Sequence, residues 1–213
     1  MIFLKSSSEL DAMDRANHLV HRVLGLVRAT ARPGVSTADL DELAEETIFD
    51  AGGVPAFKGY RGFPATLCTS INDVIVHGIP SSKALLAEGD VVSVDCGVLL
   101  DGFYGDAAVS FGVGEVSKEA SRLMETTRRC LEDAVAAVAP GRRLGDVGAA
   151  VQVRAETQGF GIVREFVGHG IGRSLHEDPQ VPNYGIAGHG QVMKPGLVIA
   201  IEPMITSGSW RVR

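Results

Sequence analysis

The sequence lacks the features that mark several classes of protein. It has three cysteines, an odd number with no Cys-x-x-Cys spacing, which fits a reducing compartment and neither a disulfide framework nor a zinc ribbon. It has no run of basic residues and a formal net charge of −6, so nothing in it favours nucleic acid as a partner. No apolar run reaches the ~18–20 residues of a membrane span, and the N-terminus lacks a complete signal-peptide core. We therefore expect a cytoplasmic protein that binds neither membranes nor nucleic acid.

The composition is that of an ordinary globular protein. The 213 residues are 45% hydrophobic and 22% charged, a balance typical of a packed core under a polar surface. This length is enough for one large domain or for two small halves that share a core. We expect a single domain that covers residues 1–213.

Three sets of landmarks recur at one fixed offset of 107 residues. They are Pro33-Gly34 with Pro140-Gly141, Gly52 with Gly159, and Gly89 and Asp95 with Gly196 and Glu202. A constant offset indicates an internal duplication, with halves at about residues 1–113 and 114–213, although chance matches are the alternative. In this duplication Glu202 is the counterpart of Asp95, and we expect both carboxylates where the halves meet, since pockets form at such places.

Apolar residues at helical spacing predict four helices. They cover about residues 8–29, 36–51, 117–138 and 144–158. The second of them should begin at Ser36 with Asp39 completing a capping box. Each half then contains two helices followed by strands. The predicted class is α+β, with helices outside a mostly antiparallel sheet.

The stretch from Gly89 to Asp106 predicts a β-hairpin around an Asp101-Gly102 turn. In such a hairpin Asp95 and Asp106 can lie across from each other on adjacent strands. Two acids that share an apolar site repel, so at neutral pH they require a proton or a cation between them. The alternative is that both are ordinary turn or edge aspartates.

Two histidines and one glutamate are further candidates for the same site as this carboxylate pair. His77 follows a strand-like segment, Val74–Val76, and is either structural or a hydrogen-bond donor to a substrate amide. His169 has glycine on both sides, which allows close backbone approach and unusual dihedral angles. Glu202 is expected at the end of a buried strand over Val198–Met204.

Asp95, Asp106, His169 and Glu202 form an oxygen-rich set with one imidazole. Such a set suits Mn, Fe(II), Co or Zn, and it also admits Mg. Two ions about 3.5–4 Å apart can share a hydroxide and polarise a carbonyl. Metal-assisted hydrolysis is the reaction class that follows. The loop over residues 54–70, which carries several aromatic residues, either packs as a loop or forms the apolar wall of a pocket.

Taken together and in order, four motifs resemble the type I methionine aminopeptidases of the peptidase M24 family. They are Thr69–Asp73, His77–Pro80, Gly168–Arg173 and Ile201–Met204. The resemblance covers nearly the whole chain. It implies the pita-bread fold, one or two divalent ions (Co, Mn, Fe or Zn) and removal of the initiator methionine from nascent chains by metal-activated water.

The resemblance also implies a role for each matching residue. Asp95 would bind one metal, Asp106 would bridge both, and His169 and Glu202 would bind the other. Glu202 would also be the general base. His77 and His176 would position the substrate and stabilise the tetrahedral intermediate. The pocket for the methionine side chain would be lined by Tyr60, Phe63, Cys68 and His77.

Two departures from the family pattern are visible. Leu175 stands where the family commonly has an aromatic residue. The family also has a bridging glutamate beyond the Glu-Pro-Met strand, whereas no acidic residue follows Glu202 here and the 107-residue offset from Asp106 falls on Arg213. We therefore expect the last strands and the fifth ligand to be missing, and the sheet to keep an open edge.

The missing ligand leaves alternatives to an active aminopeptidase. One is a catalytically weak or inactive pita-bread module that binds a peptide or a protein partner, which would cover the open sheet edge. Another is a proline-directed relative of the same fold, against which the His77–Pro80 and Thr69–Asn72 motifs argue. Without a covering partner the chain is expected to be a monomer.

Overall fold

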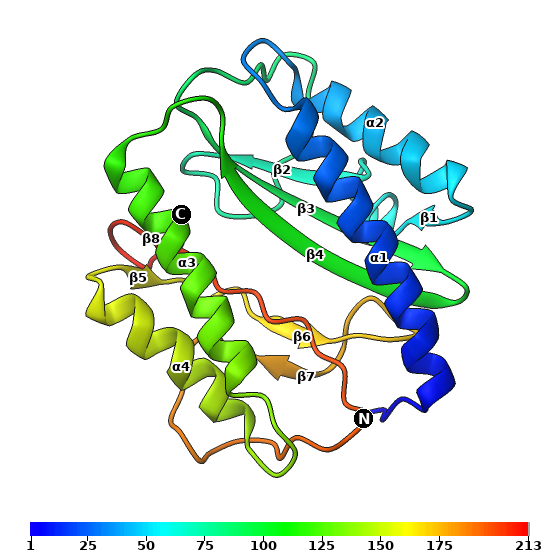
Figure 1. The fold of residues 1–213 in the computed structure, drawn as a ribbon, viewed down its shortest axis with the longest axis vertical. Coiled ribbons are helices and arrows are strands. Elements are labelled where there is room, and N and C mark those ends of the chain that lie inside the picture. Colours follow the sequence, from blue (N-terminus) through cyan, green and yellow to red (C-terminus); the bar gives the residue numbers. More distant parts are fainter. Residues whose placement is uncertain (213) are drawn as a thin grey trace. The chain divides into compact units, whose positions relative to one another are not determined.

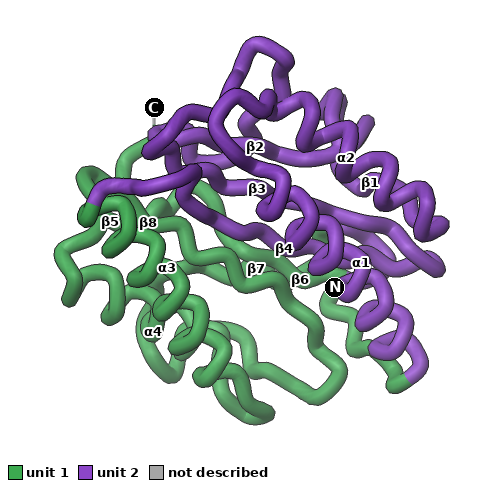
Figure 2. The backbone as a smooth tube through the Cα atoms, turned by 45° about the horizontal axis from the view of Figure 1, so that its top comes forward, with its two compact units in different colours: residues 1–7, 118–171, 176–213 green, residues 8–117, 172–175 purple. Residues whose placement is uncertain are grey.

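The computed structural model describes residues 1–212, so Arg213 and its predicted place in the duplication lie outside the described residues. The chain divides into two compact units (Figure 2). Unit 1 contains residues 1–7, 118–171 and 176–213, and unit 2 contains residues 8–117 and 172–175.

Each half of the chain consists of two helices followed by strands (Figure 1). The elements of the first half are α1 Ser7–Thr30, α2 Thr37–Asp50, β1 Val54–Pro55, a 3₁₀ turn η1 Tyr60–Gly62, β2 Leu67–Ile71, β3 Val91–Leu100 and β4 Phe103–Gly112. The elements of the second half are α3 Lys118–Ala136, α4 Leu144–Thr157, β5 Gly161–Ile162, β6 Gly168–Gly170, β7 Glu177–Val181 and β8 Ile205–Thr206. All four predicted helices are present.

The helix ends follow from local chemistry. At the start of α2 the Asp39 backbone N–H donates to Ser36 Oγ at 3.1 Å, and the Ser36 N–H donates to Asp39 Oδ2 at 3.0 Å. This is the predicted capping box, which satisfies two backbone donors that the first helical turn leaves without partners.

On α1 the buried residues recur every three or four positions, so one face of the helix meets the core.

Strand β3 is the centre of the sheet in unit 2, and it pairs antiparallel with β1, β2 and β4. Successive side chains of a strand point to opposite faces. On one face lie four fully buried residues that join the core formed with α1 and α2, namely Val92, Val94, Cys96 and Val98. Asp95 points to the other face, away from that core.

Residues paired directly across a sheet share a face, so the register identifies the neighbours of Asp95. Asp95 pairs with Cys68 on β2 and with Ala108 on β4, whereas Asp106 pairs with Gly97. The predicted hairpin is confirmed, and Asp95 and Asp106 lie on its two adjacent strands, although the register does not pair them with each other. The two-residue turn sets a register in which these acids are diagonal neighbours on one face, a separation of roughly 7–8 Å.

Unit 1 repeats the internal plan of unit 2 with short strands. Antiparallel pairs join β5 to β8 and β6 to β7. The bounds of α4 are those of α2 shifted by 107 residues, and the bounds of β5 are those of β1 shifted by the same number. Two isolated bridges also correspond, because Ser36 pairs with Leu85 and Arg143 pairs with Val192.

The strand predicted over Val74–Val76 is wrong. β2 ends at Ile71, Asn72 adopts a positive φ of 55°, and the Val74 N–H donates to Ile71 O at 3.1 Å. A tight turn therefore follows β2 and directs the segment after it back along that strand.

The strand predicted over Val198–Met204 is also wrong, and this segment is half-buried rather than buried. It approaches β6, where Ala200 exchanges backbone hydrogen bonds of 2.7 and 3.3 Å with His169. A bridge between Gly170 and Ile199 adds one more pairing. These few contacts hold the segment beside β6 without forming a continuous ladder.

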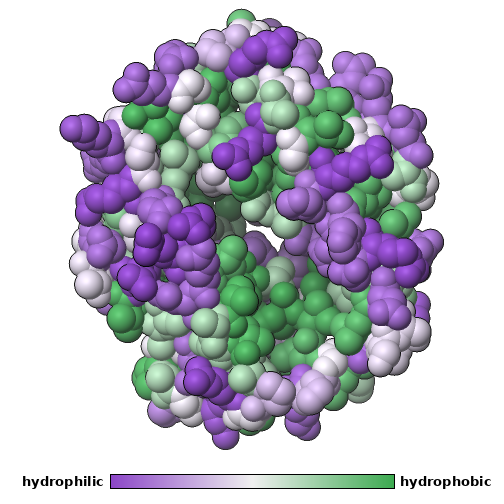
Figure 3. All heavy atoms as spheres, in the orientation of Figure 1, coloured by the Kyte–Doolittle hydropathy of each residue, from purple (hydrophilic) through white to green (hydrophobic). Residues whose placement is uncertain are grey.

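Hydrophilic side chains gather over α3 on the face drawn in Figure 3. On this helix Glu125 accepts from Arg128 at 2.8 Å and from Arg129 at 2.6 Å, at helical spacings that bring opposite charges together.

Across residues 1–212 the structure has no helix of the length and apolarity needed to cross a membrane.

The β3–β4 turn provides a test of backbone strain. Asp101 and Gly102 have φ angles of 51° and 79°, the two positive values that a mirror-image type I turn requires. Gly102→Ala should lower the free energy of unfolding by about 1–2 kcal/mol, because a Cβ disfavours this conformation. Urea denaturation measures the change.

The matched control is Gly25→Ala on α1, where nothing lies within 4 Å of the added Cβ. This substitution should raise the free energy of unfolding by up to about 1 kcal/mol, because alanine favours helix. Equal effects of both substitutions would contradict the turn assignment.

Candidate functional site

Unit 2 contributes the two aspartates of the predicted metal site. Both are half-buried on the sheet face that lies opposite the core. Burial, and after it the charges of Asp95, Asp106 and Asp41, raises the pKa of the neighbouring Cys68 thiol to about 12. The thiol therefore lies in a negative potential, which favours binding of a cation on this face.

Unit 1 brings His169 and Glu202 together. His169 is buried on β6, and its Nδ1 lies 2.9 Å from Gly170 O. A neutral ring that donates Nδ1–H to this carbonyl presents the lone pair of Nε2, which lies 3.3 Å from Glu202 Oε1. Within residues 1–212, Glu202 Oε1 is buried and has no hydrogen-bond partner. Two facing acceptors fit a bound cation, and the carbonyl bond orients the histidine as in known metal sites.

The glycines beside His169 allow close approach of backbone segments. A Cβ on Gly168 would lie 2.2 Å from Ala200 O, and a Cβ on Gly170 would lie 2.2 Å from Asp178 O. The predicted close approach is therefore confirmed. The predicted unusual dihedral angles are not, because neither glycine has a positive φ.

Asn183 fixes the main chain of Glu202, and the sequence did not single it out. Its Nδ2 donates to Glu202 O at 2.7 Å, and the residue is 1% exposed. In the sequence it stands between Pro182 and Tyr184, which indicates only a turn. Nothing in the local pattern distinguishes an anchoring asparagine from a turn residue.

His176 lies beside His169, with the ring centroids 4.3 Å apart at an angle of 47°. Its side chain is exposed, so it can meet a substrate. The next residue, Glu177, forms an ion pair of 2.5 Å with Lys5, and their side chains are 7% and 5% exposed. This buried pair, for which the sequence holds no local signal, ties the N-terminal residues to β7.

The remaining predicted residues lie in unit 2. His77 is exposed and has a positive φ of 60°, which is uncommon for a residue with a side chain. Tyr60 and Phe63 are half-buried at the two ends of η1, and Cys68 is 5% exposed on β2. Their predicted roles as pocket residues stay predictions.

Each unit by itself holds a pair of the predicted ligands. Across residues 1–212, no group of three or more His, Cys, Asp or Glu side chains is arranged to hold a metal ion. The structure thus brings together Asp95 with Asp106, and His169 with Glu202.

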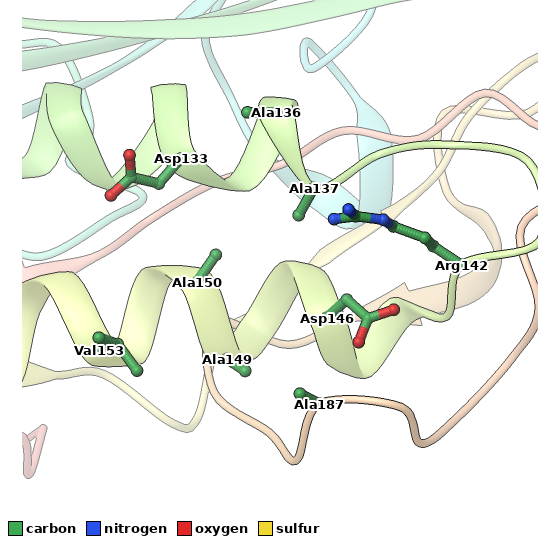
Figure 4. Close-up of a pocket in the computed structure, with 9 residues that line it drawn as sticks. All are labelled: Asp133, Ala136, Ala137, Arg142, Asp146, Ala149, Ala150, Val153 and Ala187. Carbon is green, nitrogen blue, oxygen red and sulfur yellow. The ribbon is translucent and has the colours of Figure 1, made fainter.

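A surface cavity of about 540 Å³ between α3 and α4 is separate from these residues (Figure 4). Alanine and valine line most of it. Its two carboxylates already have partners, because Asp133 accepts from Arg154 at 2.7 Å and Asp146 accepts from the Arg143 N–H at 2.8 Å. The two carboxylates are therefore already engaged, and the other charged residue of the lining is Arg142.

Comparison with known proteins agrees with this chemistry. The model of metallopeptidase family M24 matches residues 11–213. Methionine aminopeptidase of Clostridium acetobutylicum is 47% identical over 213 residues, which are 100% of this chain and 85% of that protein. Methionine aminopeptidase 1 of Mycobacterium tuberculosis is 48% identical over 211 residues, which are 96% of this chain and 79% of that protein.

Solved structures give the same result. The crystal structure of methionine aminopeptidase from Thermotoga maritima has a TM-score of 0.98 at 45% identity, and covers 100% of this chain and 86% of that one. The prolidase from Pyrococcus horikoshii has a TM-score of 0.80 at 22% identity, covers 94% of this chain and 55% of that one, and shows the fold alone. The predicted α+β pita-bread fold is confirmed.

The fold and the paired acceptor groups define a metal-dependent hydrolase. The chain belongs to metallopeptidase family M24. Its cofactor is a divalent metal ion, as the family requires.

The environment of Cys68 predicts its reactivity. Because its pKa of about 12 lies above the ordinary 9.0, the native thiol should react with iodoacetamide at pH 8 at least about tenfold more slowly than the same thiol in the unfolded chain. Peptide mapping by mass spectrometry of metal-free protein measures the rate at this one cysteine. Equal rates in native and unfolded protein would contradict the buried, negative environment.

Proposed function

We propose that this chain removes the N-terminal methionine from peptides and nascent chains, acting as a monomer in the cytoplasm. The observation that carries the proposal is the likeness to methionine aminopeptidases along the whole chain, at 47% identity over 213 residues in one case. The paired acceptors of unit 1 support it, because hydrolysis by this family depends on a metal.

The proposed metal ligands are Asp95, Asp106, His169 and Glu202, which hold one or two ions of Co, Mn, Fe or Zn. The diagonal pair of aspartates and the buried atom Glu202 Oε1 support this assignment. These donors are carboxylate oxygens and one imidazole, the ligands that such borderline metals accept.

A bound divalent ion supplies a Lewis acid for the scissile carbonyl and lowers the pKa of a water molecule. Glu202 is the proposed general base, which takes a proton from the attacking water and delivers it to the leaving amine. Its side chain is 36% exposed, so solvent reaches it. The exposed histidines His77 and His176 orient the substrate and donate hydrogen bonds to the carbonyl oxygen as it becomes negative.

The proposed methionine pocket uses Tyr60, Phe63, Cys68 and His77. A thiol with a pKa of about 12 stays neutral at physiological pH. Neutral Cys68 therefore presents a polarisable sulfur, rather than a charge, to an apolar thioether side chain.

Turnover of a Met-Ala-Ser peptide with added Mn or Co tests the function. The chain should release methionine, and Glu202→Gln should lower kcat by a factor of about 10²–10⁴, because it removes the general base. The control is Glu165→Gln, an exposed glutamate of the same unit, which should leave the rate unchanged.

The same assay with an Ala-Pro-Ser peptide tests for a proline-directed enzyme. Faster cleavage of the Ala-Pro bond than of the Met-Ala bond would favour a proline-directed enzyme. Binding of Met-Ala-Ser without cleavage, in protein shown to be folded, would favour the inactive binding module.

Titration of metal-free protein with Mn by calorimetry tests the ligands separately from turnover. Asp106→Asn and His169→Ala should each weaken the affinity at least about tenfold, since losing a ligand costs at least as much as losing a residue that orients one. Asp101→Asn in the β3–β4 turn and His189→Ala on an exposed loop are the matched controls. Unchanged affinity in the first two variants would refute the assignment, and the stoichiometry gives the number of ions.

A further inference from the structure

We propose that Ser70 is a positioning residue that holds His77 in its working conformation. The proposal rests on the proposed function, in which His77 contacts the substrate, and it adds a residue to which that function gives no role. Ser70 belongs to the Thr69–Asp73 motif and lies on β2, two residues after Cys68.

The segment that carries His77 is bound to β2 by its backbone. The Thr69 N–H donates to Gly78 O at 2.8 Å, and the Gly78 N–H donates to Ser70 Oγ at 3.2 Å. The approach is so close that a Cβ on Gly78 would lie 2.1 Å from Thr69 O. Only glycine can therefore follow His77 at this place.

His77 needs this support because its own conformation is unfavourable. Its φ of 60° lies in the left-handed region, where a side chain costs free energy unless the surroundings hold it. The backbone of His77 hydrogen-bonds to the Cys68 sulfur on one side. On the other side the next peptide N–H, that of Gly78, donates to Ser70 Oγ. The hydroxyl of Ser70 thus fixes the peptide plane that determines where the His77 ring points.

Ser70 acts through this contact rather than on the substrate. It is 3% exposed, whereas the side chain of His77 is exposed. Its hydroxyl is the only side-chain oxygen that accepts the Gly78 N–H in the described part of the chain. Removal of this hydroxyl should free His77 to leave the left-handed conformation.

The first measurement is the kinetics of Ser70→Ala on Met-Ala-Ser. We expect kcat/KM to fall about two- to tenfold, mostly in kcat, which is the range that one hydrogen bond allows. Ser70→Thr keeps the hydroxyl and should restore the rate. The control is Ser93→Ala, because Ser93 pairs with Ser70 across the sheet and its hydroxyl contacts Ser110 Oγ at 2.7 Å.

A double-mutant cycle separates positioning from general damage. In a His77→Ala background, Ser70→Ala should cause no further loss, because the residue it acts through is already absent. An equal loss in both backgrounds, or no loss in the wild-type background, would overturn the proposal.

NMR of histidine-labelled protein gives a readout that does not depend on turnover. The Cα shift of His77 should move toward ordinary backbone values in Ser70→Ala and stay unchanged in Ser93→Ala. If the wild-type chain cleaves nothing, the proposed function fails while this shift still decides the role of Ser70. If Ser70→Ala does not fold, Ser70→Cys, which keeps a weaker acceptor of similar size, takes its place.

Discussion

The alternation of side chains along β3 is the constraint on which the site depends. Because successive residues point to opposite faces, a strand that buries Val92, Val94 and Val98 under two helices must present Asp95 on the other face. The hairpin register then places Asp106 diagonally on the same face. A slip of one residue would bury the acids in the core and expose the valines. The hydrophobic effect that stabilises unit 2 therefore also orients its carboxylates.

Unit 1 orients its site with hydrogen bonds and close backbone contacts instead of a broad sheet. Gly168 and Gly170 let neighbouring chains approach β6 at distances that a Cβ would forbid. Asn183 holds the main chain of Glu202, and Gly170 O holds the ring of His169. The result places His169 Nε2 3.3 Å from Glu202 Oε1. This pair needs a proton or a cation between its two atoms, and in the proposed site a metal ion fills that place.

In each unit, a contact fixes the main chain directly after an exposed histidine. The buried ion pair of Lys5 and Glu177 anchors the chain directly after His176. The contacts of β2 with Gly78 anchor the chain directly after His77. In both cases the residue that follows an exposed histidine is held by its contacts, which fixes the main chain from which the histidine ring projects.

The sequence alone determined the helices, the capping box at Ser36, the Asp101-Gly102 hairpin, the 107-residue offset and the family, because each is written in local spacing or in a contiguous motif. It did not determine the strands outside that hairpin or the pairing within it. Val74–Val76 has strand composition but follows a turn at Asn72, and the diagonal placement of Asp95 and Asp106 follows from turn geometry. Nor did it reveal Asn183, Lys5 or Ser70 as anchors, since their partners lie 19, 172 and 8 residues away. Only the tertiary structure brings such partners within hydrogen-bonding distance, because that distance depends on how the whole chain packs.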